Sequence, residues 1–256
     1  MSSVIQHKNG QRVFIRFTLA QRIEHAIQIV SFTTLVVTGI AQKYSTHATA
    51  EWIIEACGGI EMTRTIHRIM GIVLIIESIV HVALIARSYL KGQRDFRMLP
   101  NIQDMRDAIQ MVLYFVGIRK HRARFDRYDF RQKAEYWSLV WGTIVMVATG
   151  LMMWFPVETT ALLPGEMIPA ARAAHSGEGL LAFLAILIWH MYSAHLAPEV
   201  FPFDVTMFTG KISEERMIHE HPLEYERLIA AEPAPAGPPE PPAPAQPTEP
   251  ATQDAQ

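Results

Sequence analysis

Four long apolar segments constrain the fold of this chain more than any other feature of its sequence. Each reaches the length of about 20 residues that crosses the hydrocarbon core of a bilayer. Backbone amides find no water there, so each segment is expected to close its own hydrogen bonds as an α-helix. The sequence therefore predicts an all-α fold, a transmembrane four-helix bundle, with spans at Ile23 to Gln42, Ile66 to Ala86, Tyr136 to Val157 and Ala173 to Leu196.

Lysine and arginine are unevenly shared among the segments that connect these spans. Twelve fall in residues 87–133 and four precede the first span, whereas the loops 43–64 and 158–172 hold cations only at their ends. Because cations are retained on the cytoplasmic side, we expect both termini and the long middle loop to be cytoplasmic. The N-terminal sequence MSSVIQHKNGQRVFIRF lacks an apolar core and a small-residue cleavage site, so we expect no cleaved signal peptide.

Composition outside the spans divides the chain into four regions. We expect a cytoplasmic N-terminal segment 1–22, a membrane domain 23–196 that includes the loop 87–133, a cytoplasmic C-terminal helix region 197–230, and a Pro/Ala-rich tail 231–256. In the loop, residues 101–117 have apolar positions at helical spacing, which predicts an amphipathic helix along the membrane surface or an ordinary helical loop. Ser213 is the expected N-cap of a C-terminal helix. The tail is expected to be disordered or to lie against a partner.

Five histidines lie within the apolar part of the sequence. An ionisable side chain in a bilayer is costly and is rarely without a function, and histidine is a common axial ligand of haem iron. The single cysteine, Cys57, excludes an internal disulfide, an iron–sulfur cluster held by this chain and a C-x-x-C-H haem attachment. The pattern therefore predicts a b-type haem protein with ligands among His25, His67, His81, His175 and His190.

The spacing of these histidines places them at two depths. His67 and His81 are 14 residues apart, close to four helical turns and roughly 21 Å along the axis, so both rings point to one side. His175 and His190 are 15 residues apart, and they share a face only where a bulge absorbs the extra residue. The spacing pairs His67 with His175 toward the outer face. On the inner side it leaves His25, His81 and His190 competing for two axial positions.

Glycines accompany the two outer histidines. Gly71 and Gly179 each follow a histidine by four residues, one turn further along the same face. A residue without a side chain lets a flat macrocycle approach the helix backbone, and Gly39 and Gly150 are suited to the same role. Close helix packing is the simpler explanation for one such glycine. Two histidine–glycine pairs favour the macrocycle.

Five stretches of the sequence resemble a known family. The chain is similar to the cytochrome b subunits of membrane-bound formate dehydrogenases and nickel–iron hydrogenases, whose members carry two b haems in a four-helix bundle. The resemblance covers all four spans and the C-terminal helix in the same order. Its matching stretches are RIEHAIQIVSFTTLVVTGI (22–40), TRTIHRIMGI (63–72), RYDFRQKAEYWSLVWGTIVMVATGLMMWFP (127–156), HSGEGLLAFLAILIWHMY (175–192) and GKISEERMIHEHPLEYERL (210–228).

The resemblance implies an outer haem held by His67 and His175 and an inner haem held by His25 and His190. It also implies a quinone site near the inner haem at residues 128–133, where Tyr128, Asp129 and Lys133 are the expected contacts. Asp129 and Arg131 stand where the dehydrogenase pattern has asparagine and glycine, which leaves the details of quinone contact open.

Three further polar residues have alternative explanations. His81 and His195 occupy positions that are apolar in the formate dehydrogenase pattern. They are either polar helpers, with His81 paired to Glu77 one turn earlier, or ligands that replace His25 or hold a third haem. Glu178, one turn beyond His175, is expected to pair with an arginine near a haem propionate or to help move protons.

These features together predict an electron-transfer subunit of an oxidoreductase complex in the inner membrane of a bacterium. We expect it to pass electrons between a quinone pool and a partner redox subunit through two b haems, with three as the alternative. The expected partners are membrane lipid, quinone and a catalytic or multihaem cytochrome c subunit, and no nucleic acid. The alternative function is a haem-bearing anchor or assembly subunit of a larger respiratory or photosynthetic complex.

Overall fold

Four long apolar helices dominate the computed structural model, which describes residues 4–8, 11–93, 95–198 and 200–232 of the chain. The four predicted spans are thereby confirmed as helices long and apolar enough to cross a membrane. They are α1 (Leu19–Lys43), α3 (Ile60–Leu90), α5 (Phe130–Trp154) and α7 (Met167–Leu184), the last continued by η1 (Ala185–His190) and η2 (Tyr192–Leu196).

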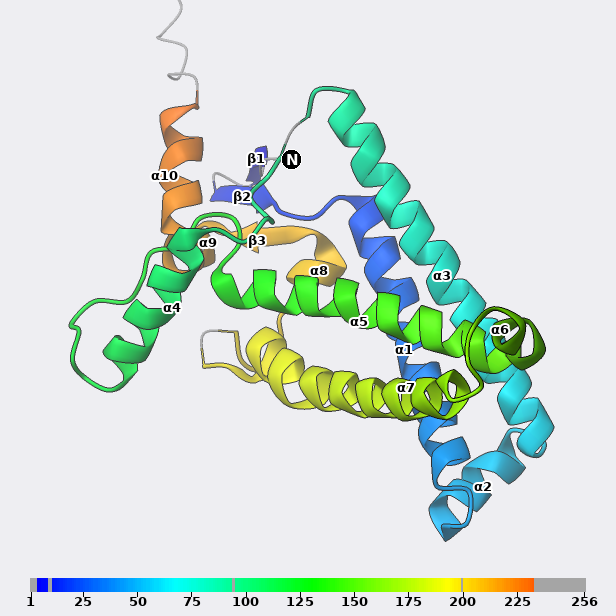
Figure 1. Ribbon diagram of the computed structural model, residues 1–256. Helices are drawn as coiled ribbons and strands as arrows, with labels where there is room; N and C mark the ends of the chain where they lie inside the picture. Colours follow the sequence, from blue (N-terminus) through cyan, green and yellow to red (C-terminus); the bar gives the residue numbers. More distant parts are fainter. Residues whose placement is uncertain (1–3, 9–10, 94, 199, 233–256) are drawn as a thin grey trace, which may run out of the picture.

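The spans form two antiparallel pairs. α1 lies against α3, and α5 lies against α7, while α1 also contacts α7 and so joins the pairs. Figure 1 shows the α5–α7 pair crossing the α1–α3 pair. Short helices connect the members of each pair at the far end of the bundle: α2 (Ala48–Ala56) and α6 (Pro156–Leu162). Capping boxes at Thr18 and Asp129 begin α1 and α5, because each side chain accepts a free amide hydrogen of the first turn.

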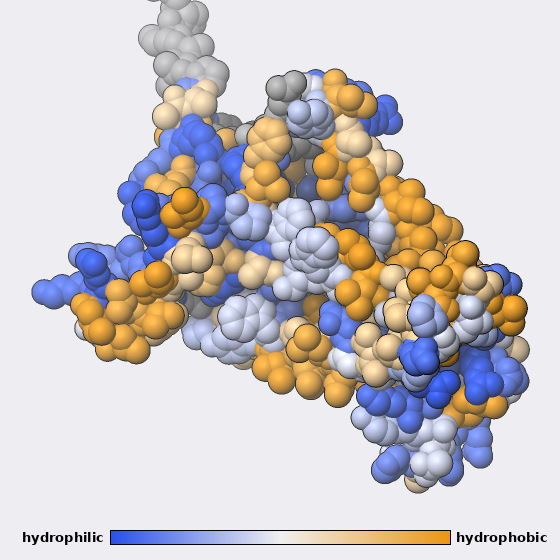
Figure 2. All heavy atoms as spheres, viewed as in Figure 1, coloured by the Kyte–Doolittle hydropathy of each residue, from blue (hydrophilic) through white to orange (hydrophobic). Residues whose placement is uncertain are grey.

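The outer surface of the bundle is apolar. In the most apolar 18-residue windows of α3, α5 and α7, no residue is buried within the protein. Figure 2 shows hydrophobic side chains across the visible surface of α3 and the lower edge of α7. A protein in water would hide most of this surface in its core. An apolar exterior over four long helices is the arrangement expected in lipid.

The end of the fourth span winds more widely than an α-helix. Residues 185–190 and 192–196 form π-helical turns, in which each turn contains an extra residue. The first of these segments, 185–190, lies between His175 and His190 and absorbs the additional residue, so both rings point into the bundle. The sequence spacing left open whether such a bulge occurs, and the structure contains one.

A small cap lies at the open end of the bundle, and it contains a β-sheet that was not predicted. β1 (Val4–Lys8), β2 (Gln11–Ile15) and β3 (Lys211–Ser213) form an antiparallel sheet in that order. α8 (Thr206–Thr209), α9 (Glu214–Glu220) and α10 (Pro222–Ala230) complete the cap. Its core contains Phe14, Ile212 and Met217. The helical expectation is therefore confirmed for the bundle and for the C-terminal helices, and the three-stranded sheet is an addition that the sequence did not predict.

The ends of the described chain meet in the cap. β2 pairs with β3, which brings the N-terminal and C-terminal regions to the same end of the bundle. Ser213 accepts a hydrogen bond from the Arg216 amide and begins α9, which confirms the predicted N-cap. The predicted tail, 231–256, lies almost entirely outside the described residues.

A buried ion cluster joins three distant segments of the chain. Glu224 of α10, which is fully buried, binds Arg16 (3.3 Å) and Arg127 (3.0 Å) through its two carboxylate oxygens. The two arginines also exchange hydrogen bonds, because each guanidinium donates to the backbone carbonyl of the other residue (2.5 and 2.6 Å). We call these three residues the Glu224 cluster. It fixes the N-terminal segment and the end of the middle loop to the C-terminal helix.

His221, beside this cluster, makes the stability of the cap depend on pH. Its Nδ1 donates to the Asp126 carbonyl (2.8 Å), and burial, reinforced by Arg16, lowers its pKa to about 3. Between pH 6.5 and about 3 the unfolded chain binds a proton that the folded cap does not. The stabilisation is therefore complete above pH 6.5 and falls as the pH is lowered, by about 1.4 kcal/mol per unit at most.

We predict that the free energy of opening of the cap falls as the pH is lowered from 7 to 5, and that His221→Gln makes this dependence shallower. The measurement is amide hydrogen exchange of α10, corrected for the intrinsic effect of pH on exchange. His219→Gln, at an exposed position of α9, is the matched control and should behave like the wild type. An unchanged slope in His221→Gln would contradict the assignment.

Candidate functional site

Four histidines form two facing pairs inside the bundle. His67 of α3 faces His175 of α7, with ring centroids 6.3 Å apart and planes at 66°. His25 of α1 faces His190 at the end of η1, with centroids 6.4 Å apart and planes at 49°. The two pairs lie at different depths, because 15 residues of the fourth span separate His175 from His190. The structure thus brings together all four histidines that the resemblance singled out.

The separation within each pair fits a metal bound between the rings. In proteins an imidazole nitrogen lies about 2.0–2.1 Å from a bound metal and about 1.1 Å from its own ring centre, so two rings on opposite sides of one metal have centres about 6.3 Å apart. Among the described residues, no group of three or more His, Cys, Asp or Glu side chains gathers around a metal position. Two axial histidines suffice where a macrocycle supplies the other ligands, as haem does.

Threonines on the neighbouring helices orient the first pair. Thr38 Oγ1 lies 2.8 Å from His67 Nδ1, and Thr149 Oγ1 lies 3.0 Å from His175 Nδ1. Each hydroxyl also donates to the carbonyl four residues earlier in its own helix, at 2.6 Å in both cases. A hydroxyl has one hydrogen to donate, so it accepts from the histidine Nδ1–H. The Nε2 lone pair of each ring is therefore free to bind a metal.

A glycine follows each of these threonines and touches the same ring. A methyl group added at Gly39 would lie 3.2 Å from His67 Cε1, and one added at Gly150 would lie 3.3 Å from His175 Cε1. Both glycines belong to one repeated motif, VVTGI at 36–40 and VATGL at 147–151. Sequence reasoning overlooked the threonines, although this repeat at equivalent places in α1 and α5 was visible.

Gly71 and Gly179 do not contact the histidines that precede them. An added methyl group at Gly71 would meet no atom of the described residues within 4 Å, and one at Gly179 would lie 3.5 Å from Met146 Cε. The glycines that limit the space around the histidines therefore come from the neighbouring helix. The open space beside Gly71 is what the predicted approach of a flat macrocycle needs, whereas the space beside Gly179 is limited by Met146.

Glutamates orient the rings nearer the cap. His190 Nδ1 lies 3.1 Å from Glu135 of α5. A carboxylate accepts the Nδ1 hydrogen and again leaves Nε2 free. His81 differs, because its Nδ1 lies 2.9 Å from Glu24 and its Nε2 lies 3.1 Å from the Tyr136 hydroxyl. Both nitrogens of His81 are thus engaged by protein groups, and the carboxylate partner is Glu24 instead of the expected Glu77.

His195 lies apart from both pairs. Its ring stacks on Phe203, with centroids 4.0 Å apart and planes within 3° of parallel. Its buried Nδ1 has no hydrogen-bond partner in the described part of the chain. The structure gives His195 an aromatic partner and does not bring it opposite a second histidine in the way His25 and His190 face each other.

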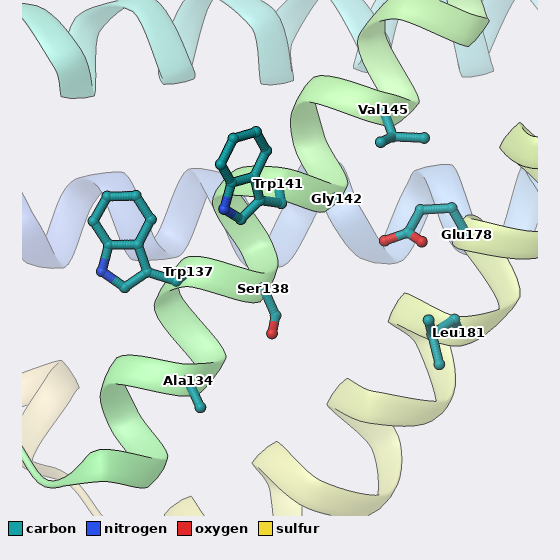
Figure 3. Close-up of a pocket in the computed structure, with 8 residues that line it drawn as sticks. All are labelled: Ala134, Trp137, Ser138, Trp141, Gly142, Val145, Glu178 and Leu181. Carbon is teal, nitrogen blue, oxygen red and sulfur yellow. The ribbon is translucent and has the colours of Figure 1, made fainter. Parts of the chain in front are cut away.

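Glu178 lines a groove between α5 and α7. Figure 3 shows its carboxylate directed toward α5, where Trp137 and Trp141 form the aromatic side of the groove. A methyl group added at Gly142 would lie 2.7 Å from Glu178 Oε1, so a larger residue there would require the Glu178 side chain to shift. No ion pair of Glu178 occurs within the described residues. The arginine partner expected from the sequence is not found.

The segment expected to contact quinone is held by hydrogen bonds at the start of α5. Asp129 accepts from the Gln132 amide (2.8 Å) and binds Arg131 (2.6 Å). Lys133 is buried and binds Asp104 of α4 (Ile102–Phe115) at 2.7 Å. Tyr128 accepts a hydrogen bond from Arg127 Nε (3.2 Å). The three residues expected to contact quinone are therefore all engaged in hydrogen bonds or ion pairs within the protein.

Comparison with known proteins places the chain in a family of membrane cytochromes. Residues 16–209 match the family described as prokaryotic cytochrome b561. The cytochrome b556(Fdn) subunit of the nitrate-inducible formate dehydrogenase of Escherichia coli (strain K12) is 23% identical over 221 residues, which cover 86% of this chain and 94% of that subunit. The formate dehydrogenase cytochrome b556 subunit of Haemophilus influenzae is 27% identical over 195 residues, covering 75% and 74%.

We predict that Gly39→Ala and Gly150→Ala each disturb the His67–His175 pair, because the added carbon must displace a ring held by a threonine. If haem is bound there, its low-spin electron paramagnetic resonance signal should shift while the second signal stays in place. Gly177→Ala is the matched control, since an added carbon there meets nothing within 4 Å. Unaltered spectra in both test variants would show that the glycines do not limit the site.

Proposed function

Because this chain belongs to the prokaryotic cytochrome b561 family, we propose that it is a membrane electron-transfer subunit carrying two b haems. One haem is held by His67 and His175 and the other by His25 and His190. The observation that carries this proposal is the facing of two histidine pairs at 6.3 and 6.4 Å, which matches the separation of about 6.3 Å expected for two imidazoles on one metal.

The hydrogen bonds around the rings support the same assignment. Thr38, Thr149 and Glu135 accept from Nδ1 of three of the four histidines, and this fixes the tautomer whose Nε2 binds metal. When bound, haem supplies an iron centre that gains and loses one electron. The chain contributes the axial ligands, their orientation and an apolar surrounding that tunes the potential.

The assignment favours His25 over His81 as the partner of His190. His25 faces His190 directly, whereas both ring nitrogens of His81 are engaged by Glu24 and Tyr136. A third haem on His81 and His195 would require those bonds to break. Two haems per chain is therefore the proposed number.

We further propose that quinone reacts at the end of the bundle that carries the cap, close to the His25–His190 pair. The start of α5 supplies Asp129 and Lys133 there, and Glu24, His81 and Tyr136 form a hydrogen-bonded group at a similar depth. Reduction of a quinone to a quinol takes up two electrons and two protons. Hydrogen-bonded acids and bases near the site suit the transfer of those protons.

We propose that this end lies in the cytoplasm, because residues 87–133 carry an excess of cations. The inner membrane of a bacterium is the corresponding location, with the His67–His175 pair toward the outer face. The curated relatives are named as subunits of formate dehydrogenases. By analogy, the partner of this chain is a catalytic or multihaem redox subunit that exchanges electrons at the outer pair.

We predict that His67→Ala and His175→Ala each lower the haem content of the purified protein by about half, and that His25→Ala and His190→Ala do the same for the other haem. His81→Ala should retain both haems, because its ring bonds protein groups. Haem per chain and the reduced b-type absorption band are the measurements. Loss of haem in His81→Ala with full retention in His25→Ala would reverse the inner assignment.

We also predict that Asp129→Asn slows the reduction of haem by quinol several-fold without lowering haem content. Asparagine still caps α5 but removes the negative charge. Stopped-flow absorption at the b-type band measures the rate. Asp107→Asn, on α4, where Asp107 accepts a hydrogen bond from Gln103, is the control. Equal rates in wild type and Asp129→Asn would place the quinone site elsewhere.

A further inference from the structure

α4 turns its apolar side chains away from the rest of the protein. Ile102, Met105, Ile109, Val112 and Val116 recur at helical spacing and are all strongly exposed, with Ile102 at 75% and Val112 at 61%. On the opposite side, Met111 is buried and Asp104 binds Lys133. A helix that packs on a protein in water shows the reverse arrangement. We call the five exposed residues the α4 apolar stripe.

The start of α4 lies at the level where α5 begins. The Asp104–Lys133 ion pair (2.7 Å) joins the first turns of the two helices. Trp137, one turn further along α5, donates to the Met98 carbonyl just before α4 (3.0 Å). Tryptophan is enriched at the boundary between hydrocarbon and headgroups. These contacts place α4 beside the membrane boundary, and Figures 1 and 2 show it projecting from the bundle with a hydrophobic patch on its outer side.

Cations border the α4 apolar stripe. Arg106 follows Ile102 by one turn, and Arg119 and Lys120 come directly after the helix; all three are exposed. Within the described chain none of the three forms an ion pair. Arg124, by contrast, binds Glu226 (2.5 Å). An exposed apolar stripe edged by unpaired cations is the pattern of helices that lie in the interface of an anionic membrane.

We propose that α4 and the segment 116–120 form a lipid-binding surface that takes the headgroups and upper acyl chains of anionic phospholipids. The apolar stripe enters the headgroup–acyl boundary, and Arg106, Arg119 and Lys120 bind the phosphates. Through Asp104 and Lys133, this lipid contact also positions the first turn of α5.

Depth measurement on the full-length protein tests the apolar part. In a Cys57→Ser background, spin labels are attached at Val112→Cys and, as the matched control on the polar side of α4, at Gln103→Cys. The protein is reconstituted into vesicles of phosphatidylcholine and phosphatidylglycerol. The label at 112 should be accessible to oxygen and protected from a water-soluble nickel chelate, and the label at 103 should show the opposite. A label at 112 exposed to the chelate, or shielded from both reagents by a protein neighbour, overturns the proposal.

Lipid retention tests the charged part. Native mass spectrometry of the purified protein, titrated with phosphatidylglycerol, should show weaker binding after Arg106→Gln, Arg119→Gln and Lys120→Gln, by about fivefold for each cation. Arg124→Gln is the control, because its cation is already paired, and it should lose much less. Equal retention in the triple variant and the control, or no preference of the wild type for phosphatidylglycerol over phosphatidylcholine, overturns headgroup recognition.

Discussion

An imidazole inside a membrane has two nitrogens to satisfy, and the way this chain satisfies one of them determines the rest of the site. At His67 and His175 the Nδ1 hydrogen goes to a threonine whose own hydrogen is already given to its helix. Hydrocarbon offers no competing water, so the ring cannot easily exchange this partner. The second nitrogen of His67 and of His175 is left without a proton, in two rings that face each other across 6.3 Å. This arrangement supports the proposed role of the two rings as axial ligands.

The two helix pairs of the bundle hold their histidines with the same kinds of residues. In both, a Thr-Gly dipeptide on the first helix supports a histidine on the second. Nearer the cap, Glu24 of α1 binds a histidine of α3, and Glu135 of α5 binds a histidine of the fourth span. The pairs then diverge: His25 follows the first glutamate, and Tyr136 follows the second. This single difference gives His190 a facing histidine and gives His81 a hydroxyl.

The sequence was sufficient for the spans, the pairing of His67 with His175 and the need for a bulge before His190, because hydropathy and helical rise are local properties. It was insufficient where distant segments meet. The β-sheet was missed because β3 has three residues and forms only against the N-terminal hairpin. Spacing alone did not separate His25 from His81, since the partners of His81 come from α1 and α5. Which helix supplies a glutamate is decided by packing.

The Glu224 cluster has a consequence for the order in which the chain matures. Arg16 and Glu224 are 208 residues apart. Arg16 can therefore pair with Glu224 only after all four spans have been synthesised. Before that, burying Arg16 and Arg127 would leave two positive charges without the Glu224 carboxylate. Closing the cap without α10 is therefore not favourable. Closure of the cap therefore marks a chain whose spans have all been synthesised, and a protein truncated before α10 would present an open, protease-sensitive end.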